Sequence, residues 1–306
     1  LYDILSLMHN PDISLVLGSG GARGLAHIGI IRCLEHRGFR IRYISGTSIG
    51  ALIGGIYAAG KLDEFTAWVC ELDKGSVLRL LDWSFSFGAI FKGDRIISTL
   101  KDLVGECNIE DLPIGFTAVA ADLNSEREIW FNHGPLFEAI RASVAVPMIF
   151  KPVKSGHRLL VDGGLVNPVP IAPTFNNDSD LTIAVDLNAT PEGRLEGESK
   201  EDAAEEPDEK SEYRQKLEMF TEMLFPSESK TDLETVPGFF DLMMRSMDVM
   251  QTTIASFKLA AYKPGITITV PRDRCGFFEF YRAREIIDFG YQRADRVLEA
   301  YHFDRN

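Results

Sequence analysis

The sequence has little of three features that mark large classes of proteins. Its four cysteines, Cys33, Cys70, Cys107 and Cys275, form no CxxC pair and have no nearby histidines at metal-ligand spacing, so we expect reduced thiols. No apolar run reaches the roughly 20 residues that cross a bilayer, and no leader of the secretory type opens the chain. No basic patch is visible in a chain of net charge -13, which argues against nucleic acid as a partner. These absences predict a cytoplasmic protein, with the periphery of the inner membrane as an alternative.

Acidic residues are in excess, and much of the excess lies in one stretch. Residues 192–212 hold ten acidic residues against three basic ones, with no aromatic residue among them. Such a stretch cannot bury enough apolar surface to offset the entropy of ordering, so we predict a mobile loop. We interpret it as an insertion within one domain, with a domain boundary as the alternative. The predicted division is an N-terminal extension over 1–12, a core over 13–190, the acidic insertion over 191–235, and helices and a strand completing the same domain over 236–306.

The first sixty residues alternate between strand and helix patterns. Ile13–Leu17 is a short apolar run that ends at glycines, as a buried strand does, and helix-spaced apolar residues follow over Leu25–Glu35. Ile41–Ser45 then indicates a second strand, and Ser48–Ala59 a helix of small and apolar residues. Repeated β-α units favour a parallel sheet. We therefore predict an α/β fold, a three-layer sandwich with a mostly parallel central sheet.

The same two periodicities predict further elements along the chain. The last helix places Ala283, Ile287, Ala294 and Leu298 near one face, so it should pack on the core. The predicted strands are Ile114–Ala121, Glu128–Phe131, Arg158–Val161, Leu181–Leu187 and Ile266–Val270, and the predicted helices are Arg95–Val104, Leu136–Ser143 and Glu279–Ala300.

Ser48 is the first candidate for chemistry, at the centre of Gly46-Thr47-Ser48-Ile49-Gly50. The pattern matches GxSxG between a predicted strand and a predicted helix, the context in which a nucleophilic serine sits on a sharp turn. Side chains in place of Gly46 and Gly50 would collide with the neighbouring strand and helix. The helix N-terminus favours the negative charge that develops during attack. The alternative is that Ser48 only caps the helix.

A glycine-rich loop, Gly18-Ser19-Gly20-Gly21-Ala22-Arg23-Gly24, follows the first strand. Consecutive glycines let backbone N–H groups converge on an anion. A dinucleotide site is disfavoured because Arg23 stands at the sixth position of the motif and no acidic residue ends the second strand, and the Gly-Lys-Ser/Thr of a P-loop is absent. We interpret the loop as an oxyanion hole made by the N–H groups of Gly20 and Gly21, with Arg23 shaping or charging the loop. No cofactor and no metal is expected.

Asp162-Gly163-Gly164 follows a predicted strand, and an Asp-Gly pair usually marks only a turn. A triad in α/β-hydrolase order needs a histidine after the acid, and only His302 follows. A carboxylate on this turn can instead accept the Ser48 proton directly. Because a free aspartate has a pKa of about 3.9, this role requires a desolvated site, so we expect an apolar pocket.

Four motifs in order resemble those of the patatin-like phospholipase family, specifically its bacterial branch related to neuropathy target esterase. They are the glycine loop, Gly46–Gly50, Ser143-Val144-Ala145-Val146-Pro147 and Asp162–Gly164. The resemblance covers most of residues 13–190, and Phe277–Ala294 also resembles the C-terminal helix of that branch. It implies a Ser48–Asp162 dyad, an oxyanion hole from the loop containing Gly20, Gly21 and Arg23, and no metal. The glycines that support these motifs are Gly18, Gly24, Gly46, Gly50, Gly163 and Gly164.

Two apolar segments are candidates for lipid contact. Four aromatic residues cluster in a Gly- and Ser-containing segment that we consider a lid over the serine; they are Trp83, Phe85, Phe87 and Phe91. A helical face over Phe239–Tyr262 holds Met243, Met247, Met250 and Ile254, and we interpret this stripe as core rather than as a lipid-binding surface.

The predicted function is a serine acyl hydrolase that cleaves phospholipid or lysophospholipid esters through an acyl-enzyme. Two alternatives stay open: an acyltransferase with the same dyad, and a regulatory or binding protein that keeps the fold with little activity. A lipid acyl ester is the expected partner, with transient contact to a membrane surface. The oligomeric state is left open.

Overall fold

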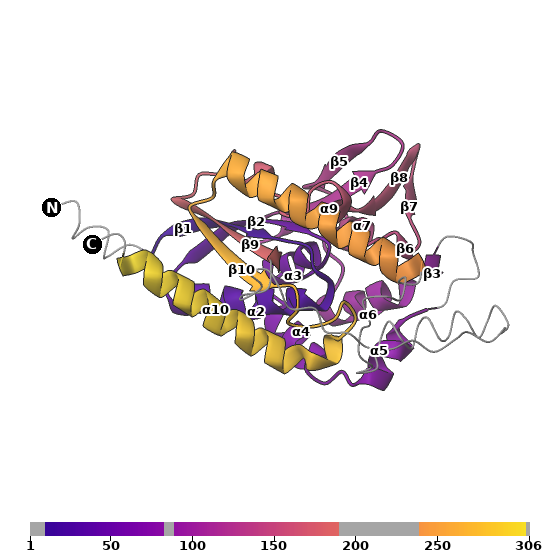
Figure 1. Ribbon diagram of the computed structural model, residues 1–306, viewed down its shortest axis with the longest axis horizontal. Coiled ribbons are helices and arrows are strands. Elements are labelled where there is room, and N and C mark those ends of the chain that lie inside the picture. The colour runs from indigo at the N-terminus through magenta and orange to yellow at the C-terminus, as the bar shows by residue number, and fades with distance from the viewer. Residues whose placement is uncertain (1–9, 83–88, 190–238, 304–306) are drawn as a thin grey trace, which may run out of the picture.

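The computed structural model describes residues 10–82, 89–189 and 239–303, and within them a central sheet organises the chain (Figure 1). Its strand order is β10-β9-β1-β2-β4-β8-β7, with β5 paired to β4. The first five of these strands run parallel, whereas β8, β7 and β5 pair antiparallel, so the predicted mostly parallel sheet is confirmed. The strands are β1 (Asp12–Leu17), β2 (Arg40–Thr47), β4 (Gly115–Asp122), β5 (Arg127–Phe131), β7 (Val153–Ser155), β8 (Arg158–Asp162), β9 (Leu181–Ala189) and β10 (Ile266–Pro271).

The helices follow the predicted segments closely where the apolar periodicity is long. The predicted helix Leu136–Ser143 has those bounds in the structure, and the last helix begins at Ala283 rather than Glu279 because a 3₁₀ turn precedes it. The short helices α4 and α5 and the three-residue strands β3 (Ala89–Phe91), β6 (Met148–Phe150) and β7 were not predicted from the sequence; β3 and β6 pair with each other. The helices are α2 (Ala26–His36), α3 (Ile49–Ala58), α4 (Leu62–Val69), α5 (Lys74–Leu80), α6 (Asp94–Val104), α7 (Leu136–Ser143), α9 (Phe239–Tyr262) and α10 (Ala283–Phe303), and the 3₁₀ turns are η1 (Gly21–Leu25), η2 (Ile109–Asp111), η3 (Gly163–Leu165), η4 (Ala172–Thr174) and η5 (Phe280–Arg282).

Both faces of the sheet are covered, because its strands are apolar on both sides. Ile13, Leu15 and Leu17 of β1 are fully buried on the face that α2, α3 and α10 cover. Val16 points to the opposite face, where it packs in one cluster with Ala255 of α9. Figure 1 shows α9 and α10 on either side of the strands β9 and β10. The predicted three-layer sandwich is therefore confirmed.

The closing helix α10 buries the face that the sequence predicts. Ala283, Ile287, Ala294 and Leu298 are all buried, and α10 packs along α2. Gly290 makes this contact close, because a Cβ at Gly290 would lie 2.2 Å from the carbonyl oxygen of Ala26.

The predicted buried face of α9 is wrong. Of the predicted stripe only Met247 is buried, whereas Met250 is 47% exposed. The helix turns Asp248 and Gln251 inward beside Met247, toward a small cavity under the helix. Apolar periodicity could not find this face, because the surface that α9 covers is itself partly polar.

The other expectations from the sequence concern the cysteines, the predicted lid and the acidic insertion. All four cysteines are free, as predicted, and Cys33 and Cys275 are buried. Phe91 is fully buried in a cluster with Ile149, so it belongs to the core rather than to a lid. The other three aromatic residues of the predicted lid and the acidic insertion lie outside the described residues.

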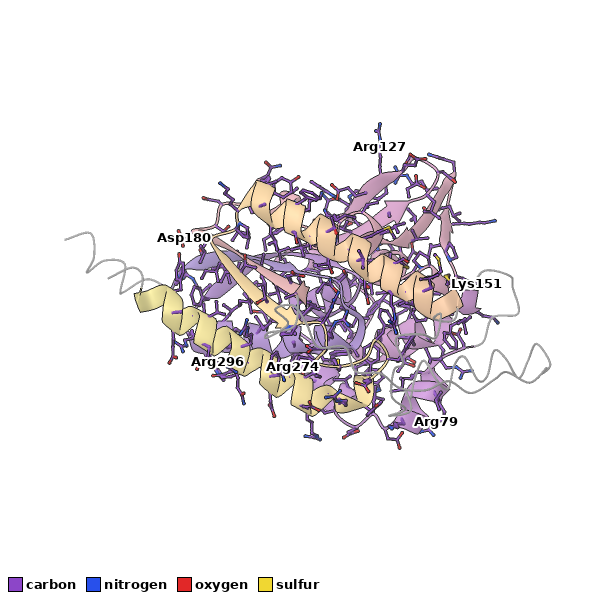
Figure 2. All side chains as sticks on the ribbon, in the orientation of Figure 1. Arg79, Arg127, Lys151, Asp180, Arg274 and Arg296 are labelled. Carbon is purple, nitrogen blue, oxygen red and sulfur yellow. The ribbon has the colours of Figure 1, made fainter. Side chains whose placement is uncertain are left out.

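Charged side chains lie mainly at the periphery, as Arg79, Arg127 and Arg296 illustrate (Figure 2). In the part of the chain that the structure describes, each helix is too short or too polar to span a membrane.

Candidate active site

Ser48 occupies the sharp turn between β2 and α3. Its backbone angles, φ 58° and ψ -124°, lie outside the regions that non-glycine residues favour, at a cost of about 1–3 kcal/mol. The side chain makes no capping hydrogen bond to α3, so the interpretation of Ser48 as a helix cap is wrong.

Two close approaches explain the glycines on either side of Ser48. A Cβ at position 46 would lie 2.5 Å from the carbonyl oxygen of Gly50, and a Cβ at position 50 would lie 2.1 Å from that of Leu17. Because these neighbours are backbone atoms of α3 and β1, no side-chain rotation relieves the overlap. The two glycines therefore allow the turn to pack against both elements.

Two N–H groups of the glycine loop, those of Gly20 and Gly21, differ from their neighbours in their hydrogen bonding. Gly18, Ser19 and Ala22 donate to backbone carbonyl oxygens at 2.9 to 3.0 Å. Gly21 lies in the left-handed region, with φ 57°, which re-aims the backbone at this point. Within the described residues, the N–H groups of Gly20 and Gly21 donate to no backbone or side-chain acceptor. The donors that the sequence analysis assigns to an oxyanion hole are thus the ones that remain available.

Arg23 ties the glycine loop to the ends of β9 and β10. Its guanidinium donates to Asn188 Oδ1 at 3.2 Å and to the carbonyl oxygen of Arg272 at 3.3 Å. Asn188 Nδ2 in turn donates to the carbonyl oxygen of Ser19 at 3.1 Å. Burial lowers the pKa of Arg23, and the carboxylate of Asp248 opposes this shift. Of the two roles expected for Arg23, these contacts serve the shaping of the loop.

The buried side chain of His27 forms a hydrogen bond with the same loop. The Nε2 atom of His27 forms a 2.9 Å hydrogen bond with the carbonyl oxygen of Gly18. Complete burial lowers the pKa of His27 to about 4, so the ring is neutral at pH 7 and Nε2–H is the donor. His27 is therefore a packing residue. No histidine is among the described residues that line the two cavities beside Ser48.

Asp162 ends β8 and is 3% exposed. Its Oδ1 accepts the N–H of Gly164 at 2.7 Å, whereas Oδ2 is buried with no hydrogen-bond partner among the described residues. Burial raises the pKa of Asp162 to about 7, against the opposing effects of the Ser48 hydroxyl and the Gly164 N–H. The expectation of a desolvated site around this carboxyl group is confirmed.

The supporting glycines of the other motifs also lie at close contacts. A Cβ at Gly24 would lie 2.3 Å from the side chain of Ile49, which lets η1 pack on the start of α3. A Cβ at Gly163 would lie 2.2 Å from the carbonyl oxygen of Val119, which fixes the turn after Asp162 against β4.

A small cavity brings together residues from three loops that are distant along the chain. A narrow cavity of about 20 Å³ is lined by Gly20, Arg23, Ser48 and Asp162. Helix α9 also contributes to its wall, through Met247, Asp248 and Gln251 among others. The nucleophile and base candidates therefore face one enclosed volume.

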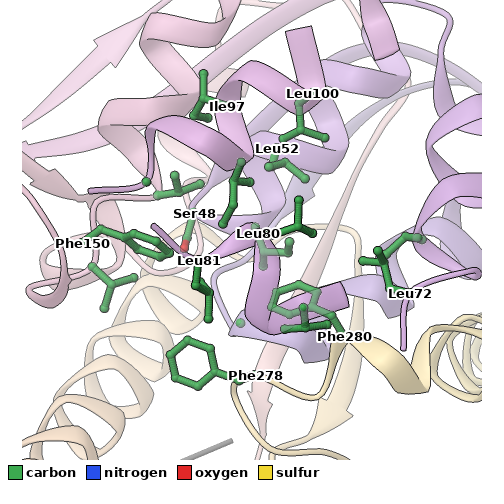
Figure 3. Close-up of a pocket in the computed structure, with 18 of the residues that line it drawn as sticks. Ser48, Leu52, Leu72, Leu80, Leu81, Ile97, Leu100, Phe150, Phe278 and Phe280 are labelled. Carbon is green, nitrogen blue, oxygen red and sulfur yellow. The ribbon is translucent and has the colours of Figure 1, made fainter. Parts of the chain in front are cut away.

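A larger cavity begins on the other side of Ser48. Its volume is about 130 Å³, and Gly21 also lines it. Apart from Ser48, Arg141 and two glycines, every described residue that lines it is apolar. Figure 3 shows Ser48 and Leu72 on opposite sides of this cavity, with Leu80 between them.

Three polar residues in and beside the small cavity, Asn188, Asp248 and Gln251, were not predicted from the sequence. Asn188 is the second-last residue of β9, and the carboxyl ends of parallel strands meet at one edge of a sheet, so strand position was a usable signal. Asp248 and Gln251 interrupt the apolar pattern of α9 at the spacing of one helical turn. That interruption is the signal of a helix that covers a site rather than a core.

Comparisons with known proteins agree with this geometry. The family model for patatin-like phospholipases matches residues 15–175, which hold the glycine loop, the GxSxG turn and Asp162-Gly163-Gly164. The chain belongs to the patatin-like phospholipase family. The predicted resemblance is therefore confirmed, and membership of this family implies a lipid acyl hydrolase.

Relatives of the chain include an uncharacterized protein and a named esterase. An uncharacterized NTE family protein of Mycobacterium tuberculosis is 37% identical over 343 residues, which covers 96% of this chain and 93% of that protein. The neuropathy target esterase sws of Drosophila melanogaster is 32% identical over 186 residues, or 58% of this chain and 13% of the esterase. The crystal structure of VipD from Legionella pneumophila aligns with a TM-score of 0.46 at 13% identity, over 95% of this chain and 67% of VipD.

Proposed function

We propose that the protein hydrolyses acyl esters of phospholipids or lysophospholipids, with Ser48 as nucleophile and Asp162 as general base. The observation that carries this proposal is that buried Asp162, whose Oδ2 has no hydrogen-bond partner among the described residues, lines the same cavity as Ser48. A base works best when its pKa lies near the working pH, and burial raises the pKa of Asp162 to about 7.

Acylation begins when Asp162 Oδ2 takes the proton of the Ser48 hydroxyl as Ser48 Oγ attacks the ester carbonyl carbon. The negative charge that develops on the carbonyl oxygen is stabilised by the free N–H groups of Gly20 and Gly21. The tetrahedral intermediate then collapses and breaks the bond to the alcohol oxygen, which receives the proton from Asp162. An acyl ester on Ser48 and a free alcohol or lysolipid result.

Deacylation uses the same groups again, with a water molecule as the attacking group. Asp162 takes a proton from a water molecule, whose oxygen attacks the acyl carbon, and the same two N–H groups hold the second oxyanion. When this intermediate collapses, Ser48 Oγ leaves and recovers the proton from Asp162. The fatty acid departs and the free enzyme is restored.

The apolar lining of the larger cavity suits a long hydrocarbon chain on the acyl side of the ester. Nearly all of its lining is apolar, and it runs from Ser48 toward Leu72. Burial of a CH₂ group contributes about 0.8 kcal/mol, so a long acyl chain gains more from this cavity than a short one. The smaller cavity carries Arg23, Asp248 and Gln251 and suits polar atoms next to the ester bond.

The proposal is tested with purified protein, short-chain nitrophenyl esters and a lysophospholipid, beside Ser48→Ala and Asp162→Asn. We expect both variants to lose turnover by roughly 10³-fold or more, because loss of a nucleophile or its base removes the covalent route. Equal turnover by all three proteins would refute the proposal.

Two further measurements separate the proposal from its alternatives. A fluorophosphonate should label Ser48 in the wild-type protein, whereas a binding protein without catalysis would stay unlabelled. Product analysis with an added acceptor alcohol distinguishes hydrolysis from acyl transfer, because a transferase would release mainly the new ester.

A further inference from the structure

The segment Ser143–Pro147, at the end of α7, contacts the backbone of both members of the proposed dyad. Ser143 is fully buried, and its Oγ accepts the N–H of Ser48 at 2.9 Å. The same hydroxyl donates to the carbonyl oxygen of Val119 in β4 at 2.6 Å. Two residues later, the carbonyl oxygen of Ala145 accepts the N–H of Asp162 at 2.9 Å.

These hydrogen bonds connect the turn at Ser48 and the turn at Asp162, which are far apart in the sequence. Ser48 has the strained angles of a sharp turn, and strain of this kind persists only where surrounding contacts over-determine it. Ser143 supplies such a contact, because it holds the Ser48 N–H to a hydroxyl that β4 anchors in turn. Since Ala145 holds the N–H of Asp162, the segment fixes both the nucleophile and the base relative to the central sheet.

We propose that Ser143 is a positioning residue, whose hydroxyl holds the Ser48 backbone so that the Ser48 side chain faces Asp162. This inference rests on the proposed function. Ser143 itself lines neither of the cavities beside Ser48, whereas Val144 and Val146 of the same segment do. Loss of its hydroxyl therefore acts on the reaction through Ser48, with no direct contact to the substrate.

Ser45 provides a matched control in the strand that leads to Ser48. It is fully buried like Ser143, but its Oγ has no hydrogen-bond partner among the described residues. Ser45→Ala thus removes a buried hydroxyl group, as Ser143→Ala does, but breaks no hydrogen bond among the described residues. Any effect specific to Ser143→Ala then reports the contact with Ser48.

The test measures kcat, KM, the rate of fluorophosphonate labelling and the melting temperature for Ser143→Ala, Ser143→Thr and Ser45→Ala. A misplacement of about 1 Å can cost about 10²-fold in rate, so Ser143→Ala should lower kcat and the labelling rate by about that factor. KM should stay unchanged, because the cavities keep their lining. Threonine keeps the hydroxyl and should restore most of the rate, and Ser45→Ala should match the wild type.

The inference is wrong if Ser143→Ala keeps kcat within twofold of the wild type, if its effect falls on KM alone, or if Ser45→Ala loses as much activity. Should Ser143→Ala not fold, Ser143→Cys replaces it, because sulfur keeps the volume but accepts hydrogen bonds weakly, and the same readings decide. A fully active Ser48→Ala variant would instead overturn the proposed function. An inactive Ser48→Ala beside an unaffected Ser143→Ala would overturn only the role of Ser143.

Discussion

Replacing the buried carboxyl group of Asp162 by an amide should remove activity and at the same time stabilise the folded protein at neutral pH. The pKa of Asp162 is about 7 in the folded protein, against 3.8 for an unperturbed aspartate. Because this folded pKa is raised, the contribution of Asp162 to stability is complete below about pH 3.8 and is lost as the pH rises to about 7. The difference of about three pKa units corresponds to about 4 kcal/mol in the free energy of unfolding.

The assay is urea unfolding of the wild type and Asp162→Asn between pH 4 and pH 8.5. Asparagine resembles the protonated carboxyl group in shape and charge, so the two proteins should be about equally stable near pH 4. The advantage of Asp162→Asn should grow with pH and reach about 4 kcal/mol above pH 7. A difference that does not change with pH, or a less stable Asp162→Asn at pH 8, would refute the assignment of a buried, destabilised carboxylate.

Asp122, on the neighbouring strand β4, is a control with the opposite sign. Its carboxylate accepts hydrogen bonds from Ser125 Oγ and from the backbone N–H groups of Asn124 and Leu159. The Ser125 bond is the main reason why the pKa of Asp122 is lowered. Asp122→Asn should therefore be less stable than the wild type at neutral pH, with a deficit that shrinks as the pH falls.

Three further outcomes follow from the site. The value of kcat/KM should rise with pH through about 7, because Asp162 must lose its proton to act as a base, and a pH–rate profile without this limb would contradict the role of Asp162. Leu72→Trp should lower turnover of long-chain nitrophenyl esters but spare acetyl and butyryl esters, because Leu72 lies across the apolar cavity from Ser48; an equal loss for all chain lengths would show that the chain does not reach Leu72. Gly50→Ala should lower the melting temperature and prevent labelling of Ser48, because the new Cβ would lie 2.1 Å from the carbonyl oxygen of Leu17, and a fully stable, labelled variant would contradict this packing.

Local sequence patterns predicted the elements that bear the site and the residues that the site brings together. The apolar run before Gly18 and the helix pattern after Ser48 locate two strand ends, and parallel strands place such ends at one edge of a sheet. Gly46 and Gly50 were predictable because the sharp turn brings them against the backbone of α3 and of the neighbouring strand β1. A raised pKa of Asp162 was expected because no histidine was available as the base, and an aspartate can take that role only in a desolvated site.

Contacts between distant segments were not predictable from the same patterns. The bond from the N–H of Ser48 to Ser143 joins residues 95 positions apart, and the two motifs that contain them do not show that they pair. The inward face of α9 was predicted wrongly because Asp248 and Gln251 line a partly polar cavity, where an apolar stripe gives no guidance. The partners of Arg23 were hidden for the same reason, since they come from β9 and from the residue after β10.

The most direct measurement of the central claim is the site and rate of covalent labelling by a fluorophosphonate, read by peptide mass spectrometry across pH. The account predicts a single adduct on Ser48, a labelling rate that falls below about pH 7 as Asp162 becomes protonated, and a strong loss of labelling in Asp162→Asn. An adduct on another residue, or labelling of Ser48 at the wild-type rate in Asp162→Asn, would contradict it.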